Sequence, residues 1–367
     1  MSGLLVHEWI EATGGAENVL ESFSEVFSES DILCLWDDAP GRFADRKVIQ
    51  SWLSHTPLRK KKALALPFML RAWRNIQLDK RYEWMLVSSH LFAHHVQLKD
   101  QSIPKYVYAH TPARYIWRPD LDGRGRSLGA RSLSPALRSV DRRRAAEATK
   151  IAANSMFIRD RIQDVWNVDS EVIYPPVAVD TILSTDDWLS RVTDNDEYEV
   201  LANLPPSYVM GASRFVSYKR LDLVIKTGEI LGIPVVLAGN GPDVQHLSDL
   251  AKAAKVPVTL VIAPSNSLLY AIMQAALAFV FPAVEDFGIM PVEAQACGTP
   301  VVTGPLGGQM ETYYDGITGV TANSTSPQDL SEAVKKAIGL DPFDRHESTS
   351  RFSKLTFHNK IQRFVAN

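Results

Sequence analysis

The sequence of 367 residues lacks several features that would assign it to common protein classes. No apolar run approaches the roughly 20 residues that a membrane-spanning helix needs, and the N-terminus has no charged region followed by a cleavable apolar stretch. Only two cysteines are present, Cys34 and Cys297, which are too few for a disulfide framework and favour a reducing compartment. The sequence therefore predicts a globular, cytoplasmic protein long enough to form two hydrophobic cores.

The usual signs of a metal or a bound dinucleotide are also absent. Histidine and cysteine form no convincing cluster at metal-ligand spacing, and the paired acids Asp120–Asp122 and Asp194–Asp196 do not follow a clear strand. The six-residue glycine fingerprint of dinucleotide-binding folds is missing. We therefore expect no metal site and no resident cofactor.

Charge is nearly balanced overall but uneven along the chain. The net charge is −3, yet residues 56–150 contain 20 lysines and arginines against 7 aspartates and glutamates, a local excess of +13. The block includes Arg59 to Lys62, directly before the apolar run Ala63 to Leu70. It suits an anionic lipid surface, an acidic acceptor or nucleic acid, and equally a solvated face above core side chains. Pro67 is expected to interrupt a helix there, which favours surface contact over deep insertion.

Two series of alternating strands and helices run through the chain. Such alternation predicts an α/β protein of two Rossmann-like domains, with parallel sheets facing across a cleft. Pro175 and Pro176 fix an extended connection, so we place the first domain at residues 1–176 and the second from residue 177. Strands are expected at 3–7, 32–36, 84–88, 105–109, 151–153 and 172–174, and then at 208–212, 234–238, 258–262, 278–282 and 300–303.

The stretch from Val284 to Pro300 places two glutamates around a predicted helix start. Glu285 lies in a loop after a buried strand, and Glu293 lies in the first turn of a helix expected over residues 291–297. The helix N-terminus offers free amides and the positive end of a dipole, which suit a diphosphate. Each carboxylate could accept two hydrogen bonds from a diol, one on a ribose and one on a hexose. Alternatively, Glu293 only complements the dipole and Glu285 is a solvated loop residue.

Two basic residues follow the strand expected at 208–212. Arg214 and Lys219 lie in the connection to the next helix, where they would supply a planar fork and a point charge to a diphosphate. Fixed cations of this kind stabilise a departing nucleoside diphosphate without a metal. Either residue alone is more often a plain surface residue.

Three residues of the first domain are further candidates. Gly14 and Gly15 follow the first strand and would let the backbone approach a phosphate or sugar, although a plain turn is the alternative. His110 directly follows a strand, which puts its imidazole at the sheet edge where open α/β proteins bind ligands. A lone histidine is otherwise more often structural.

With these residues in place, the chain resembles the retaining family-four glycosyltransferases of GT-B fold. The resemblance rests on the two glutamates with seven residues between them, on Phe-Gly inside that interval and on Ala-Cys-Gly-Thr-Pro-Val after it. It covers nearly the whole chain and is greatest for bacterial mannosyltransferases that use GDP-mannose in polysaccharide assembly. Further matching segments are His7 to Trp9, Gly14 to Glu17, Tyr108 to Pro112, Ile173 to Val177 and Phe352 to Phe364.

The resemblance implies roles for the candidate residues. Glu285 would hold sugar hydroxyls, Glu293 the ribose, and the two basic residues the diphosphate, while His110 would sit beside the reacting carbon. A terminal helix at 352–367 would return to the first domain and end the second at 351. The implied catalytic residues are His110, Glu285, Arg214 and Lys219, and the implied donor-binding residues are Gly14, Gly15, Arg214, Lys219, Glu285, Phe287, Gly288, Ile289 and Glu293.

The implied reaction is a retaining, metal-independent transfer of a hexosyl group, mannosyl from GDP-mannose, to a saccharide or lipid-linked acceptor in polysaccharide or glycolipid synthesis. The expected partners are the nucleotide-sugar, that acceptor and the anionic inner face of the cell membrane, and not nucleic acid. Ile262 and Ala263 stand where the family usually has a small glycine beside the base, so a UDP-sugar is a second candidate donor. A sugar-nucleotide epimerase of the same fold and a nonreacting binding subunit also fit the residues that carry the resemblance.

Overall fold

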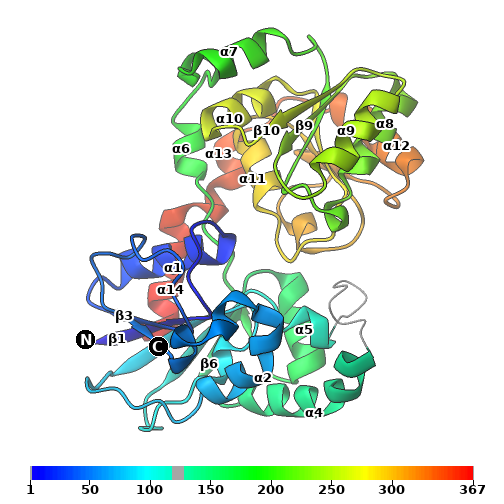
Figure 1. The fold of residues 1–367 in the computed structure, drawn as a ribbon. Coiled ribbons are helices and arrows are strands. Elements are labelled where there is room, and N and C mark those ends of the chain that lie inside the picture. Colours follow the sequence, from blue (N-terminus) through cyan, green and yellow to red (C-terminus); the bar gives the residue numbers. More distant parts are fainter. Residues whose placement is uncertain (1, 118–127, 367) are drawn as a thin grey trace. The chain divides into compact units, whose positions relative to one another are not determined.

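The computed structural model describes residues 2–117 and 128–366, and the chain divides into two compact units. Unit 1 comprises Met1–Pro176 with Phe357–Asn367, and unit 2 comprises Val177–Thr356. Each unit is built on one parallel sheet with helices packed against it (Figure 1). The predicted α/β class with two Rossmann-like domains is confirmed.

The sheet of unit 1 has seven strands in the order β3-β2-β1-β4-β5-β6-β7. The chain winds from β1 outward to β3 and then returns to the other side of β1 to form β4, so the winding direction reverses between β1 and β4. Crossover connections leave a crevice at such a point. The strands are β1 (Gly3–His7), β2 (Asp31–Cys34), β3 (Val48–Gln50), β4 (Trp84–Ser89), β5 (Lys105–Ala109), β6 (Lys150–Ala153) and β7 (Glu171–Val172).

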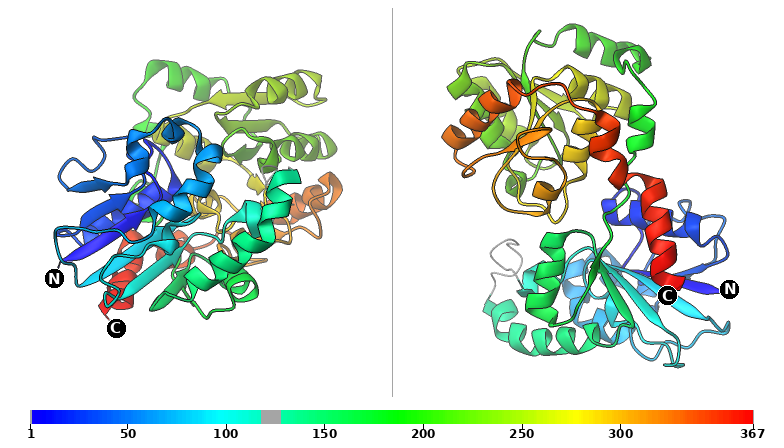
Figure 2. Two further views of the ribbon diagram at one scale, coloured as in Figure 1. Left: turned by 60° about the horizontal axis from the view of Figure 1, so that its bottom comes forward. Right: turned by 180° about the vertical axis from the view of Figure 1, so that it is seen from behind.

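Helices cover both faces of this sheet because alternate strand residues point to opposite sides. Leu4 and Val6 pack into one core with α2, α3 and α5, whereas Leu5 packs into the other with α1 and α14. Phe357 of α14 stacks on Phe23 of α1 with ring centroids 5.7 Å apart, and Figure 2 shows α14 lying along this sheet. The helices are α1 (Gly15–Val26), α2 (Lys62–Ala72), α3 (Arg114–Trp117), α4 (Leu128–Ala145), α5 (Met156–Trp166) and α14 (Lys354–Ala366).

The sheet of unit 2 has six strands in the order β10-β9-β8-β11-β12-β13, and its winding reverses between β8 and β11. Its strands are β8 (Val209–Ala212), β9 (Val235–Gly239), β10 (Val258–Ile262), β11 (Ala278–Phe281), β12 (Val301–Thr303) and β13 (Gly319–Thr321). Its helices are α6 (Val179–Leu183), α7 (Asn195–Ala202), α8 (Leu221–Leu231), α9 (Val244–Ala253), α10 (Asn266–Ala275), α11 (Ile289–Ala296), α12 (Pro327–Ile338) and α13 (Arg345–Thr349).

The helix around Pro67 departs from the sequence-based expectation. Helix α2 runs without interruption from Lys62 to Ala72, so the expectation that Pro67 breaks it is wrong. A proline inside a helix removes one backbone hydrogen bond. Here Ala65 and Met69 are buried on either side of it, and their packing holds both halves of the helix against the sheet. No helix among the described residues combines the length and apolar composition that crossing a bilayer needs.

A buried aspartate joins α4 to the rest of unit 1. One carboxylate oxygen of Asp141 lies 2.8 Å from His95 Nε2 and 3.1 Å from His94 Nε2. The other accepts hydrogen bonds from the indole nitrogens of Trp117 and Trp166, at 2.6 and 2.7 Å. Burial raises the pKa of Asp141, but the two histidines outweigh burial and hold that pKa well below its usual range. Because both oxygens have donors, the carboxylate is stable in the interior.

Candidate active site

The candidate site in unit 2 lies where the winding of its sheet reverses. Lys219 follows β8, at the end of the 3₁₀ turn Ser217–Lys219, and Glu285 follows the neighbouring strand β11. The Lys219 ammonium lies 2.5 Å from a carboxylate oxygen of Glu285, and the two side chains are only 12% and 19% exposed. The carboxyl ends of adjacent parallel strands therefore bring together two charges that are 66 residues apart in the sequence.

A second connection fixes the loop that carries Glu285. The Glu285 amide donates to Gln309 Oε1 at 3.0 Å, and the Gly308 amide donates to the Glu285 carbonyl at 2.8 Å. A Cβ at Gly308 would overlap the carbonyl oxygen of Asp286, so this close approach of two loops requires glycine. Gln309 is fully buried and was not among the residues predicted from the sequence.

Helix α11 begins two residues earlier than predicted. It starts at Ile289, preceded by Gly288 with a left-handed φ of 108°, and ends at Ala296. Its first amides have no acceptor within the helix, as expected for an anion site. The expectation that Glu293 lies in the first turn is wrong, because Glu293 is the fifth helical residue. Sequence alone favoured Pro291 as the start, whereas the glycine conformation at 288 sets it.

Glu293 is a partly buried acid with one described hydrogen bond. Its carboxylate accepts from the Tyr270 hydroxyl of α10 at 3.4 Å, a long distance for such a bond. Burial raises the pKa of Glu293 to about 7, and the tyrosine only partly offsets that effect. A carboxylate in this state gains from any ligand that donates hydrogen bonds to it.

The other unit 2 residues named from the sequence differ in their exposure. Arg214 donates from Nη2 to the Tyr218 hydroxyl at 2.8 Å, in an exposed position. Phe287 is buried against Phe352, so only its backbone can meet a ligand. Ile262 is 46% exposed, and Ala263 has a left-handed φ of 49°, a conformation that glycine adopts more readily.

In unit 1, His110 lies at the carboxyl edge of the sheet beside the reversal between β1 and β4. Its Nε2 lies 2.8 Å from the Ser88 hydroxyl of β4, and the same hydroxyl lies 3.0 Å from His7 Nδ1 of β1. The pKa of His110 is lowered to about 3, mainly by burial and to a smaller extent by the neighbouring His90 and His7. The ring is therefore neutral at physiological pH and can act through hydrogen bonds.

A second histidine at this edge was missed by sequence reasoning. His90 follows β4, and its Nδ1 lies 3.2 Å from a carboxylate oxygen of the fully buried Glu8. The other oxygen of Glu8 accepts from the amides of His90, Leu91 and Ala93 at 3.1, 2.8 and 2.9 Å. Burial raises the pKa of Glu8, but His90, His7 and these amides outweigh it and lower the pKa. Knowing that β1 and β4 are neighbours would have identified the pair.

Gly14 and Gly15 begin helix α1 in unit 1. Gly14 precedes the helix and Gly15 is its first residue. A Cβ at Gly14 would overlap a carboxylate oxygen of Glu17, which is buried to 4% exposure. Gly14 therefore makes room for a buried acid, a structural role that the sequence did not reveal. Gly14, Gly15 and His110 belong to unit 1, and all other predicted site residues belong to unit 2.

One group in the described chain has metal-ligand composition, namely His94, His95 and Asp141, whose ligand atoms lie within 4.8 Å of one another. Both Asp141 oxygens already have nitrogen neighbours, and the Lys105 ammonium donates to the His94 carbonyl at 3.0 Å. A hydrogen-bonded structural network accounts for this geometry. Of the two acid pairs, Asp194 caps helix α7 by accepting from the Glu197 amide, and Asp120–Asp122 lies outside the described residues.

Two family models match the chain. The model described as "Glycosyltransferase Family 4" matches residues 13–181, and the model described as "Glycosyl transferases group 1" matches residues 193–354. Together they account for nearly all of the two units.

Curated relatives are similar to a little over half of the chain. A D-inositol 3-phosphate glycosyltransferase of Mycobacteroides abscessus is 28% identical over 218 residues, which are 56% of this chain and 48% of that protein. A GDP-mannose-dependent alpha-(1-6)-phosphatidylinositol monomannoside mannosyltransferase of Mycolicibacterium smegmatis is 29% identical over 220 residues, 55% of this chain and 56% of that protein. The match thus spans about half the length of these relatives.

Solved structures share the fold over the whole chain. HepE of Anabaena, solved with UDP, has a TM-score of 0.72 and 16% identity, and the match covers 100% of both chains. WaaG, a glycosyltransferase of lipopolysaccharide biosynthesis, has a TM-score of 0.61 and 14% identity, covering 100% of this chain and 95% of that one.

The raised pKa of Glu293 predicts a pH effect on stability. In the unfolded chain this group ionises near the ordinary glutamate pKa of about 4.3. Its folded pKa is about 7, so its contribution to stability is complete below the unfolded value and is lost as the pH rises through 7. Urea unfolding at pH 5 and pH 8 should show the variant Glu293→Gln gaining on the order of 1–3 kcal/mol relative to wild type at the higher pH.

The matched control is Glu332→Gln, because Glu332 is an exposed glutamate of α12 whose pair with Lys335 lies on the surface. It should follow the wild-type pH dependence. Equal pH dependence of wild type and Glu293→Gln would show that Glu293 is not the buried acid described above.

Proposed function

Because this chain belongs to the glycosyltransferases whose halves are described as family 4 and group 1, we propose that it transfers a hexosyl group from a nucleotide-sugar to a saccharide or lipid-linked saccharide. The observation that carries the proposal is the Lys219 and Glu285 ion pair, 2.5 Å long, at the point where the sheet of unit 2 reverses its winding. Both side chains are largely buried. Lys219 suits the diphosphate of a donor molecule and Glu285 suits its sugar hydroxyls.

The ion pair suggests how the donor is accepted. Before the donor binds, Lys219 and Glu285 neutralise each other, so neither charge stands uncompensated in a half-buried place. A diphosphate would take over Lys219, and sugar hydroxyls would take over Glu285. The amides that open α11 would meet the same diphosphate. Arg214, in the same loop as Lys219, would add a second cation as negative charge develops on the leaving group.

Glu293 is assigned to the ribose. Its carboxylate is enclosed enough to have a raised pKa and has one long hydrogen bond, to Tyr270. A vicinal diol could supply two further hydrogen bonds and would favour the ionised form. His110 of unit 1 is assigned to the reacting sugar by the family resemblance, and its neutral ring suits a hydrogen bond to a hydroxyl. The transfer is proposed to retain configuration and to use these fixed cations in place of a metal.

The nucleotide and sugar are finer proposals. GDP-mannose is favoured because the Mycolicibacterium smegmatis relative is named as GDP-mannose-dependent. A UDP-sugar is the runner-up, because HepE of the same fold was solved with UDP and with UDP-glucose. An epimerase would convert the donor without an acceptor, and a binding subunit would turn nothing over.

Titration calorimetry with GDP and UDP, and transfer of labelled sugar to lipid and oligosaccharide extracts, test this function. Glu293→Gln should weaken nucleotide binding about 10- to 100-fold, because hydrogen bonds to charged groups are worth about 1.5–3 kcal/mol. Glu285→Gln should bind bare nucleotide at least as tightly as wild type, because it removes the carboxylate that competes for Lys219, and should lower turnover about 100-fold, because the Glu285 contacts to sugar hydroxyls stabilise the transition state. Glu332→Gln is the matched control and should change neither quantity.

Wild-type nucleotide affinity in Glu293→Gln together with wild-type turnover in Glu285→Gln would contradict the assignment. Stronger binding of UDP than of GDP would replace the proposed donor with the runner-up. All assays contain EDTA, so activity that appears only after manganese is added would contradict the metal-independent mechanism.

We further infer that unit 1 binds the anionic inner face of the cell membrane, where a lipid-linked acceptor would be found. Three large apolar side chains are exposed beside the basic run, namely Trp52, Leu64 and Phe68, at 47%, 59% and 45% exposure. The rings of Trp52 and Phe68 meet edge to face with centroids 6.5 Å apart. Exposed aromatic and aliphatic groups of this kind favour the membrane interface.

The basic run contributes less than its sequence suggests. Arg59 pairs with Asp38 at 2.6 Å, and Lys62 pairs with Glu11 at 2.6 Å. Lys60 and Lys61 form no ion pair with any described residue. At about 1 kcal/mol for each basic residue near an anionic leaflet, two free lysines hold the protein only weakly. The apolar group must therefore supply part of the affinity.

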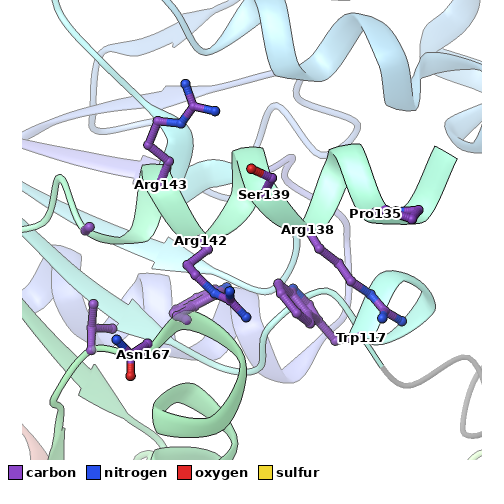
Figure 3. Close-up of a pocket in the computed structure, with 10 residues that line it drawn as sticks. Trp117, Pro135, Arg138, Ser139, Arg142, Arg143 and Asn167 are labelled. Atoms are coloured by element: carbon purple, nitrogen blue, oxygen red, sulfur yellow. The ribbon is translucent and has the colours of Figure 1, made fainter.

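A pocket of about 650 Å³ along α4 offers a further place for an anionic headgroup. Figure 3 shows Arg138 and Arg142 directed toward Trp117, while Arg143 points away from it. The two guanidinium groups lie 5.4 and 5.6 Å from the Trp117 ring. The indole is in turn held by Asp141, so the pocket wall is fixed in place.

Cosedimentation with vesicles tests the membrane proposal. Wild type should bind vesicles that contain anionic lipid at low salt, and binding should weaken as salt screens the charges. The double variant Trp52→Ser, Phe68→Ser should bind less at every salt concentration. Ile338→Ser, an exposed apolar residue of unit 2, is the matched control and should bind as wild type does. Absence of binding to anionic vesicles even at low salt would leave a protein with a soluble acceptor.

A further inference from the structure

A continuous chain of polar groups runs from a buried acid to His110. A carboxylate oxygen of Glu17 lies 4.0 Å from His7 Nε2. The His7 Nδ1 lies 3.0 Å from the Ser88 hydroxyl, which lies 2.8 Å from His110 Nε2. Glu17, His7 and Ser88 are at most 4% exposed, so water does not compete for these contacts.

The acid at the start of the chain determines which nitrogen of His7 carries a proton. Burial raises the pKa of Glu17, but the contact with His7 outweighs it and lowers that pKa, so Glu17 is an anion at neutral pH. His7 Nε2 has no hydrogen-bond partner among the described residues, and the Glu17 carboxylate is the ionic group beside it. The anion therefore favours a proton on His7 Nε2, which leaves Nδ1 with its lone pair.

The Ser88 hydroxyl has a single proton, so the tautomer of His7 determines the tautomer of His110. A hydroxyl that lies between two ring nitrogens donates to one and accepts from the other. If His7 Nδ1 carries a lone pair, Ser88 donates to it and must accept from His110. That acceptance requires a proton on His110 Nε2 and leaves the lone pair on His110 Nδ1.

We propose that Glu17, acting through His7 and Ser88, fixes His110 in the Nε2-protonated tautomer, so that its Nδ1 accepts a hydrogen bond from a hydroxyl of the bound substrate. Glu17, His7 and Ser88 are thus positioning residues. The substrate hydroxyl rests on the proposed function, whereas the tautomer does not.

The neighbouring pair of His90 and Glu8 supplies an internal comparison. His90 Nδ1 lies 3.2 Å from the Glu8 carboxylate, so this ring should carry its proton on Nδ1 and its lone pair on Nε2. The two histidines stand side by side, with ring centroids 6.4 Å apart, yet they are expected to be opposite tautomers. Glu8 is the acid in contact with His90, whereas Glu17 acts on His110 only through His7 and Ser88.

The tautomers can be measured directly by long-range proton–nitrogen correlation spectra of the full chain with ¹⁵N-labelled histidine. His110 is expected to show a protonated Nε2 and an unprotonated Nδ1, and His90 the reverse. In Glu17→Gln the charge that selects the His7 tautomer is gone, so the His110 signals should move toward the Nδ1-protonated pattern while those of His90 stay in place. Ser88→Ala breaks the chain at its centre and should also release the His110 preference.

A wild-type His110 that is protonated on Nδ1 would overturn the proposal. Unchanged His110 signals in both Glu17→Gln and Ser88→Ala would overturn it as well. Using both variants keeps the test decisive if one of them unfolds, which the melting temperature reports.

Kinetics separate this proposal from the proposed function. Glu17→Gln should lower kcat by between about 10-fold and 100-fold, as expected for a misdirected contact to the reacting substrate. Its affinity for bare nucleotide should equal that of wild type, because the nucleotide is assigned to unit 2. An enzyme inactive with every sugar nucleotide would refute the proposed function and leave the spectroscopic result standing. Wild-type kcat in Glu17→Gln would refute the substrate contact of His110 Nδ1.

Discussion

The reversal of winding in a parallel sheet is the constraint on which both half-sites depend. At that point two neighbouring strands send their following loops in opposite directions, so no crossover helix covers the strand ends. In unit 1 the strands are β1 and β4, and in unit 2 they are β8 and β11. Burying polar groups without hydrogen-bond partners costs free energy. At these two reversals the polar side chains pair with groups that follow the adjacent strand, as Lys219 does with Glu285 and His90 with Glu8.

The buried acids fall into two groups, those with histidine partners and one without a cationic partner among the described residues. Glu8, Glu17 and Asp141 lie against histidines, and the resulting low pKa values keep them ionised. Glu293 has no cationic partner among the groups that set its pKa, which burial raises to about 7. The first group holds unit 1 in shape and orients its histidines. Glu293 instead keeps a carboxylate that a ligand can pair with. We therefore assign the acids with histidine partners to structural support and Glu293 to ligand binding.

Much of the fold follows from the sequence because apolar runs and glycines mark the strands and turns. The strands at 3–7 and 105–109 were predicted with their observed bounds, since both are short, strongly patterned and bounded by turn residues. Strand β3 was missed because its three residues carry no pattern long enough to detect. The start of α11 was misplaced because Gly288 adopts a left-handed conformation that the sequence does not reveal. This conformation outweighs the preference of proline for the first turn.

The site was harder to predict than the fold. Lys219 and Glu285 were both named from the sequence, but their ion pair follows from the adjacency of β8 and β11, which sequence order does not reveal. His90 was missed for the same reason, because its partner Glu8 lies 82 residues earlier, directly after strand β1. A sequence motif can identify single candidate residues. Which of them form pairs can be predicted only when the order of strands in the sheet is known.

Hydrogen–deuterium exchange with and without saturating nucleotide-sugar tests the central claim most directly, namely that the donor binds where the sheet of unit 2 reverses. The account predicts slower exchange in the loop after β8, in the loop after β11 and in the first turn of α11, with bare nucleotide protecting the same three segments. Protection confined to other segments, with these three unchanged at saturation, would contradict it.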